Sequence, residues 1–139
     1  VKVKVKGLGE QRVSMNTDAL VRKTGAFAVL QKISENMGKA FAPFVDQLLP
    51  IISQNMANEH SKAIRKLSLK TFMSMLVAVG EPRNVELFQQ SIPMYVEQLT
   101  KALSRHDEKT AKILIKSLAN NLRALGRSNE THVQFLTAQ

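Results

Sequence analysis

The sequence predicts an all-α fold in which about three antiparallel helix pairs stack into an α-α superhelix. Three observations favour it: the composition, the period of the apolar residues, and glycines that recur at a regular interval. Among 139 residues only 4 are Pro and 6 are Gly, too few for an all-β domain with many tight turns. The apolar share of 44% is enough for a continuous core, which must be aliphatic because aromatic residues make up 5% and Trp is absent.

The clearest helix is expected over residues 62–79. Its apolar residues recur at spacings of three and four, the period of a helix with one buried face. Ser61 stands where an N-cap accepts from the free amides of the first turn, and Gly80 stands where the chain leaves the helix. The expected buried residues are Ile64, Leu67, Leu69, Phe72, Met75, Leu76 and Val79.

Residues 1–16 are expected to form a short extended arm or a β-hairpin. Val and Lys alternate without exception from Val1 to Lys6, which is strand periodicity with one apolar face. The segment from Gly7 to Gly9 allows a turn, and residues 12–15 alternate again. The helices, or a neighbouring segment, would have to hold such a hairpin in place, because an isolated two-stranded hairpin is marginal in water.

The helix after this arm is expected to begin near Thr17 or Asp18 and to end at Met37, with Gly38 as its stop. Its apolar stripe is expected to comprise Ala19, Leu20, Phe27, Leu30, Ile33 and Met37.

Prolines and caps place the remaining helices. Pro43 favours a helix start, Pro50 is expected to kink or divide that helix, and Pro93 favours a new start at Ile92. Asn84 is expected to cap a short helix.

The C-terminal part is expected to hold two more helices. Asp107 is expected to cap a helix over residues 108–125, and Asn129 a last short helix over residues 130–137.

The expected closing glycines recur along the chain. Gly38, Gly80 and Gly126 are 42 and 46 residues apart. Helix pairs that recur at about 40–47 residues are typical of HEAT and armadillo repeats, whose units bury their apolar faces by stacking. The expected repeats cover residues 17–58, 59–104 and 105–139, the last one truncated, after the arm of residues 1–16.

A row of lysines is expected on the outer, first-helix surface. When His60-Ser61 is aligned with His106-Asp107, Lys66 matches Lys112 and Lys70 matches Lys116. The whole row comprises Lys62, Lys66, Lys70, Lys112 and Lys116. The net charge is +9. Two interpretations stay open: a solvated convex face, or a face that binds an acidic protein or nucleic acid through phosphate contacts.

No catalytic, cofactor or metal motif is found. The three His residues lack ligand spacing, no Ser stands in a nucleophile elbow, and no Gly-rich phosphate loop opens a helix. Absence of Cys excludes disulfides, and no apolar run reaches the length of a membrane span. We therefore expect a non-enzymatic protein without a cofactor, a small-molecule substrate or a membrane partner. Because the chain starts at Val1, we also expect it to be cut from a longer polypeptide.

Two stretches resemble the importin-β (karyopherin-β) family of nuclear transport receptors. The first is the order Leu8-Gly9-Glu10-Gln11, Val13 to Thr17, Leu20, Lys23 and Leu30. The second is the stretch GKAFAPFVDQLLPIISQNM over residues 38–56. The resemblance covers residues 8 to about 126 and is greatest to the subfamily that imports ribosomal proteins and histones. The chain departs from this family in charge, because such carriers are usually acidic.

This resemblance implies a protein-binding scaffold that carries protein cargo through the nuclear pore under Ran-GTP control. It implies Ran GTPase and FG nucleoporins as further partners, and shuttling between cytoplasm and nucleus. Cargo would lie on the concave surface of the second helices. The polar residues expected there are Asp46, Gln47, Gln54, Glu97, Gln98 and Lys101. The alternatives are a basic HEAT-repeat module that binds nucleic acid and a structural scaffold for multiprotein assembly.

Overall fold

The computed structural model describes the backbone of residues 2–128 and the side chains of residues 18–126. Within this part the chain is helical and holds no strand, which confirms the all-α prediction. The elements are α1 (Lys2–Met37), the 3-10 helix η1 (Gly38–Phe41), α2 (Ala42–Met56), α3 (Lys62–Val79), α4 (Arg83–Ser104) and α5 (Glu108–Ser128).

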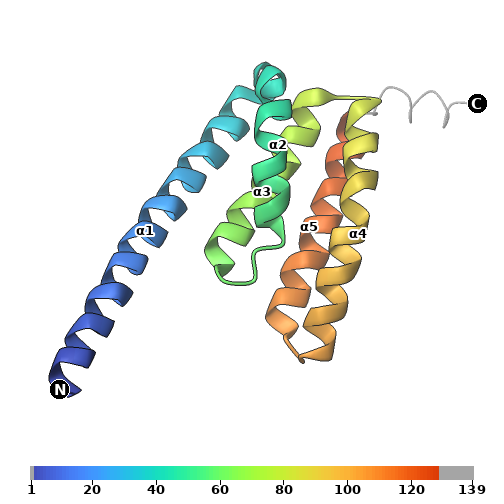
Figure 1. Cartoon of the computed structure of the whole chain (residues 1–139). Helices are drawn as coiled ribbons and strands as arrows, with labels where there is room; N and C mark the ends of the chain where they lie inside the picture. Colours follow the sequence, from blue (N-terminus) through green and yellow to red (C-terminus); the bar gives the residue numbers. More distant parts are fainter. Residues whose placement is uncertain (1, 129–139) are drawn as a thin grey trace, which may run out of the picture.

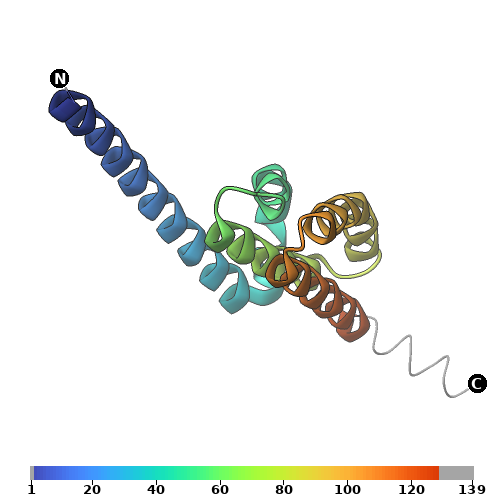
Figure 2. The same cartoon turned by 90° about the horizontal axis from the view of Figure 1, so that it is seen from below.

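The helices form two layers (Figures 1 and 2). Helices α1, α3 and α5 lie side by side and run in the same direction, whereas α2 and α4 run the opposite way in the second layer. Helix α3 contacts all four other α-helices. Because α3 and α5 begin at Lys62 and Glu108, the helix pairs recur after 46 residues, an interval typical of HEAT-like superhelices.

Helix α3 lies at the centre of the core because its neighbours bury it from several sides. Its ends agree with the sequence: the hydroxyl of Ser61 accepts from the amide of Ile64 at 3.2 Å, and Gly80 adopts a φ of 66°. Of the seven residues expected to be buried, Ile64, Leu69, Phe72, Met75 and Leu76 are buried, and the other two are half-buried.

The expected arm over residues 1–16 is wrong for the described part, because α1 already begins at Lys2. The alternating Val-Lys segment has a strand pattern, but residues 2–128 contain no second strand with which it could pair. In a helix the same segment satisfies its own backbone donors and acceptors. At the other end, α1 stops at Met37 as expected, and Gly38 has a φ of 54°.

The apolar stripe of α1 is only partly buried. Phe27 lies in the core and Leu30 packs against it, but Leu20, Ile33 and Met37 are exposed. Helix α1 stands at the end of its layer and packs against α3 and η1. The rest of its apolar side has no neighbour among the described residues to cover it.

Neither Pro50 nor Pro93 divides its helix as expected. Helix α2 continues through Pro50, and α4 continues through Pro93 as one helix of 22 residues. In each case the residue four positions earlier, Asp46 or Gln89, is exposed, so water can satisfy the carbonyl that loses its partner. Asn84 does not cap this helix: α4 begins at Arg83, and the Asn84 side chain is fully buried.

Gly126 does not end the last described helix, since α5 continues to Ser128. Glycine permits the left-handed turn that ends a helix but does not force it. Asp107 caps α5 as expected, with its carboxylate accepting from the Thr110 amide at 3.1 Å. The expected cap at Asn129 and the helix over 130–137 lie outside the described residues.

Candidate functional site

Most of the predicted binding residues lie exposed on the α2–α4 layer. Asp46, Gln47 and Gln54 are exposed on α2, and Glu97 is exposed on α4. The carboxylate of Asp46 forms an ion pair with Arg83 in the first turn of α4, so this pair links the two helices. This surface therefore carries exposed charged and amide groups.

Gln98 is the exception, because its side chain points inward. Its exposed fraction is 5%, and its amide oxygen accepts a hydrogen bond from Arg65 of α3 at 3.3 Å. The prediction that Gln98 faces a partner does not fit this geometry. Its hydrogen bond instead joins α4, in the layer of α2 and α4, to α3, in the layer of α1, α3 and α5.

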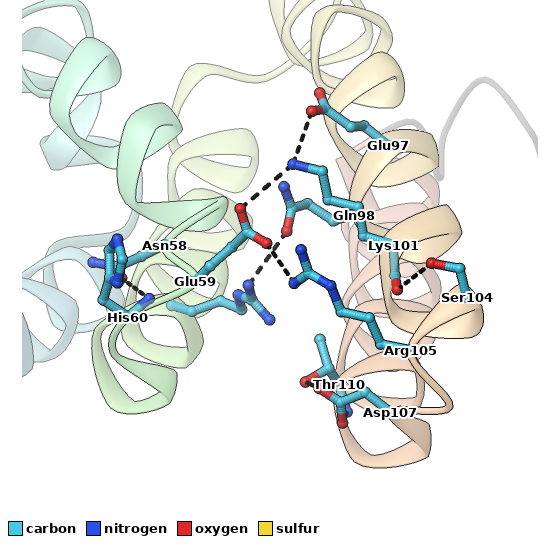
Figure 3. A network of polar contacts seen from close by, with 11 residues as sticks. Asn58, Glu59, His60, Glu97, Gln98, Lys101, Ser104, Arg105, Asp107 and Thr110 are labelled. Atoms are coloured by element: carbon cyan, nitrogen blue, oxygen red, sulfur yellow. Dashed lines mark hydrogen bonds and ion pairs between the residues drawn. The ribbon is translucent and has the colours of Figure 1, made fainter.

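A charged network lies beside these residues (Figure 3). Glu59, in the loop between α2 and α3, accepts from Arg105 at 2.9 Å and from Lys101 at 3.4 Å. Lys101 also pairs with Glu97 at 3.2 Å, one turn earlier on α4. The network ties the loop before α3 to the end of α4.

Lys101 was expected on this surface from the sequence, whereas Glu59 and Arg105 were not. A signal was present. Glu59 immediately precedes His60-Ser61, and Arg105 immediately precedes His106-Asp107, so the two residues occupy equivalent positions in successive helix pairs. Opposite charges at equivalent turns indicate a contact between neighbouring repeats.

The network makes stability depend on pH. The hydrogen bond from Arg105 and the charge of Lys101 hold the pKa of Glu59 below its ordinary value of 4.5. The stabilisation is therefore present above pH 4.5 and is lost as the pH falls through the lower pKa of the folded state. We expect Glu59→Gln to lower the melting temperature near neutral pH. We also expect it to flatten the fall of that temperature in acid, as measured by circular dichroism.

The comparison is between the variant and the wild type in the same buffers, because Asp107 also titrates in acid. Its pKa is lowered by hydrogen bonds from Thr110. Parallel pH profiles of the two proteins would show that the Glu59 contacts do not stabilise the fold. High salt should reduce the difference, since the pairs are exposed.

The predicted lysine row lies on the other layer. Lys66 and Lys70 on α3 face Lys112 and Lys116 on α5 across a groove, and Lys62 is exposed but does not line it. Lys32 of α1 lines the same groove, although it was not part of the row expected from the sequence. The row is therefore a basic groove that involves all three parallel helices.

A small polar cluster lies behind this groove, between α4 and α5. The Tyr95 hydroxyl lies 2.6 Å from the Ser117 hydroxyl and accepts from the Asn121 amide at 2.9 Å. Burial raises the pKa of the Tyr95 phenol above its ordinary value of 10.0, against the effect of these two hydrogen bonds. The Tyr95 phenol therefore stays neutral at physiological pH, and its two hydrogen bonds join α4 to α5.

The described residues contain no group of His, Cys, Asp or Glu side chains that could hold a metal ion. His60 and His106 are both exposed in their turns. No helix in the part of the chain that the structure describes is long and apolar enough to cross a membrane.

Comparison with known proteins agrees with the geometry. A protein-family model described as "IPO5-like, TPR repeats" matches residues 12–133. No curated protein and no solved structure matches the chain significantly. The matched region covers all of the helices α2 to α5 and most of α1. The chain therefore belongs to the IPO5-like family of importin-β-like helical repeats.

Proposed function

We propose that this chain is a HEAT-repeat segment of a nuclear import receptor that carries protein cargo through the nuclear pore. The observation that carries the proposal is the IPO5-like family match over residues 12–133, together with a two-layer helical superhelix. In this proposal the receptor shuttles between cytoplasm and nucleus, Ran-GTP releases the cargo, and FG nucleoporins bind during passage. Ribosomal proteins and histones are the proposed cargo class.

The repeats of the proposed scaffold cover residues 17–58, 59–104 and 105–139. The proposed cargo surface is the α2–α4 layer, with Asp46 and Glu97 as the residues that attract a basic segment. Gln47 and Gln54 would supply hydrogen bonds beside them. Lys101 holds Glu97 in place through their ion pair, and Gln98 supports the surface from below through Arg65. The segment acts by binding and not by catalysis.

The proposal is tested on the full-length protein with Ran loaded with GTP or with GDP and with a labelled basic histone-tail peptide. We expect capture of Ran in its GTP form and release of the peptide when this form is added. Asp46→Ala/Glu97→Ala should weaken peptide binding about tenfold, because the surface loses two carboxylates and their partners Arg83 and Lys101 are left to repel a basic peptide. Fluorescence anisotropy measures the affinity.

The matched control is Glu35→Ala/Glu108→Ala, which removes the same charge from the layer of α1 and α5. The peptide affinity of this variant should stay within about twofold of the wild-type value, because salt at physiological concentration screens charges that lie far from the binding surface. Failure of the full-length protein to bind Ran-GTP would refute the transport function. Equal losses in both double variants would refute the assignment of the cargo surface.

A further inference from the structure

The groove on the layer of α1, α3 and α5 has the size of a ligand site. Its volume is about 490 Å³, within the range of about 300–1,000 Å³ common for binding pockets. Figure 2 shows α3 between α1 and α5, and all three helices contribute to the lining. Neither α2 nor α4 lines it, so the groove is separate from the proposed cargo surface.

The charge of the groove is strongly one-sided. Five lysines line it: Lys32, Lys66, Lys70, Lys112 and Lys116. In the part of the chain whose side chains are described, Glu35 is the single acidic residue in the lining, and its carboxylate already accepts from Gln31 at 2.8 Å. Within the described residues, none of these lysines forms an ion pair. Such a concentration of like charge is unfavourable by itself and is relieved when a polyanionic ligand binds.

The groove also has apolar and hydrogen-bonding parts. Leu69 and Met73 of α3 and Ile113 of α5 line it between the lysines. Ser117 and Asn121 belong to its wall, and both are held from behind by Tyr95. The Asn121 side chain is fully buried, and its amide oxygen has no hydrogen-bond partner among the described residues. This part of the wall is therefore polar and is hydrogen-bonded to α4 through Tyr95.

The spacing of the lysines suits a polypeptide. Lys66 and Lys70 are four residues apart on α3, or about 6 Å along the helix axis, and Lys112 and Lys116 repeat this spacing on α5. Alternate side chains of an extended peptide recur at about 6.6 Å on one face. Acidic residues at alternate positions can therefore meet successive lysines of one helix. The intervening side chains point the opposite way and can contact the facing helix at the half-buried Met73 or Ile113.

We propose that this groove binds an acidic peptide segment of a partner protein. Nucleic acid is the less favoured ligand, because among the described residues no Arg and no aromatic side chain lines the groove to pair with phosphate bidentately or to stack on bases. The apolar lining residues Leu69, Met73 and Ile113 would find no apolar partner in a phosphate backbone. This proposal goes beyond the transport of basic cargo. It places an acidic ligand on the layer of α1, α3 and α5, whereas the basic cargo is proposed to bind the layer of α2 and α4.

The test uses the full-length protein and a fluorescein-labelled peptide of alternating Glu and Ser, followed by fluorescence anisotropy. We expect binding that weakens as salt is raised, and little binding of the peptide in which Gln replaces each Glu. Lys70→Glu/Lys116→Glu should lower the affinity at least tenfold, because it reverses one lysine on each of the two facing helices. These side chains are exposed, so the variant should fold, which the melting temperature verifies.

The matched control is Lys39→Glu/Lys109→Glu, which changes the net charge equally through two exposed lysines that do not line the groove. It should change the affinity less than threefold. Equal losses in the two double variants, or no loss in the groove variant, would overturn the proposal. Duplex DNA that binds more tightly than the peptide, and is lost in the groove variant, would assign the groove to nucleic acid instead. Ran-GTP capture should be unchanged in the groove variant, which separates this test from that of transport.

Discussion

Phe72→Ala is expected to destabilise the protein by about 3–5 kcal/mol, the range for truncation of a buried phenylalanine. Phe72 of α3 is 2% exposed and belongs to the hydrophobic core cluster, to which all five α-helices contribute. It also borders a small cavity of about 80 Å³ between α2, α3 and α4. The variant enlarges this space, and helices of two successive pairs would have to move to refill it.

The measurement is urea-induced unfolding at neutral pH. Far-UV circular dichroism reports the helices, and Tyr95 reports the α4–α5 contact because the chain has a single Tyr and no Trp. Domains of this size are stable by about 5–15 kcal/mol, so the variant should unfold at much lower urea. Leu103→Ala is the control, since Leu103 is 66% exposed and should change stability by less than about 0.5 kcal/mol. A cost below about 1 kcal/mol for Phe72→Ala would contradict the central position of α3.

The second large effect is expected for Gln98→Ala, at about 1.5–3 kcal/mol of lost stability. Arg65 is 6% exposed, and the only side-chain acceptor of its guanidinium among the described residues is Gln98. Burial lowers the pKa of Arg65, while the charges of Glu59 and Asp107 act in the opposite direction. Without Gln98 a buried cation would lose its hydrogen bond, and buried charges are costly when unpartnered.

Gln89→Ala on the exposed side of α4 is the control and should be nearly neutral. The double variant Arg65→Met/Gln98→Leu removes both polar groups and should recover most of the stability, because apolar replacement of a buried polar pair is often neutral or favourable. Urea unfolding of Arg65→Met, Gln98→Leu and the double variant gives the coupling energy. A Gln98→Ala cost below about 0.5 kcal/mol would show that Arg65 finds another partner.

Residues of the candidate surfaces could be predicted from the sequence only where they occupy aligned positions in successive repeats. Lys66 and Lys112 align in sequence, and the structure brings them to one groove. Lys32 belongs to the same groove but has no counterpart in that alignment. Its position follows from the packing of α1 against α3, which no local pattern encodes.

What the sequence determined by itself was the all-α class, the interval of the helix pairs, and the ends of α3 at Ser61 and Gly80. These signals are local: a cap or an apolar period acts within a few residues and needs no distant partner. The tertiary structure alone decided that α4 runs through Pro93 and that Gln98 points toward Arg65 and not outward. The direction in which a polar side chain points, and whether a helix survives a proline, depend on which neighbouring helix or solvent satisfies the exposed groups. That is a property of the stacked layers as a whole.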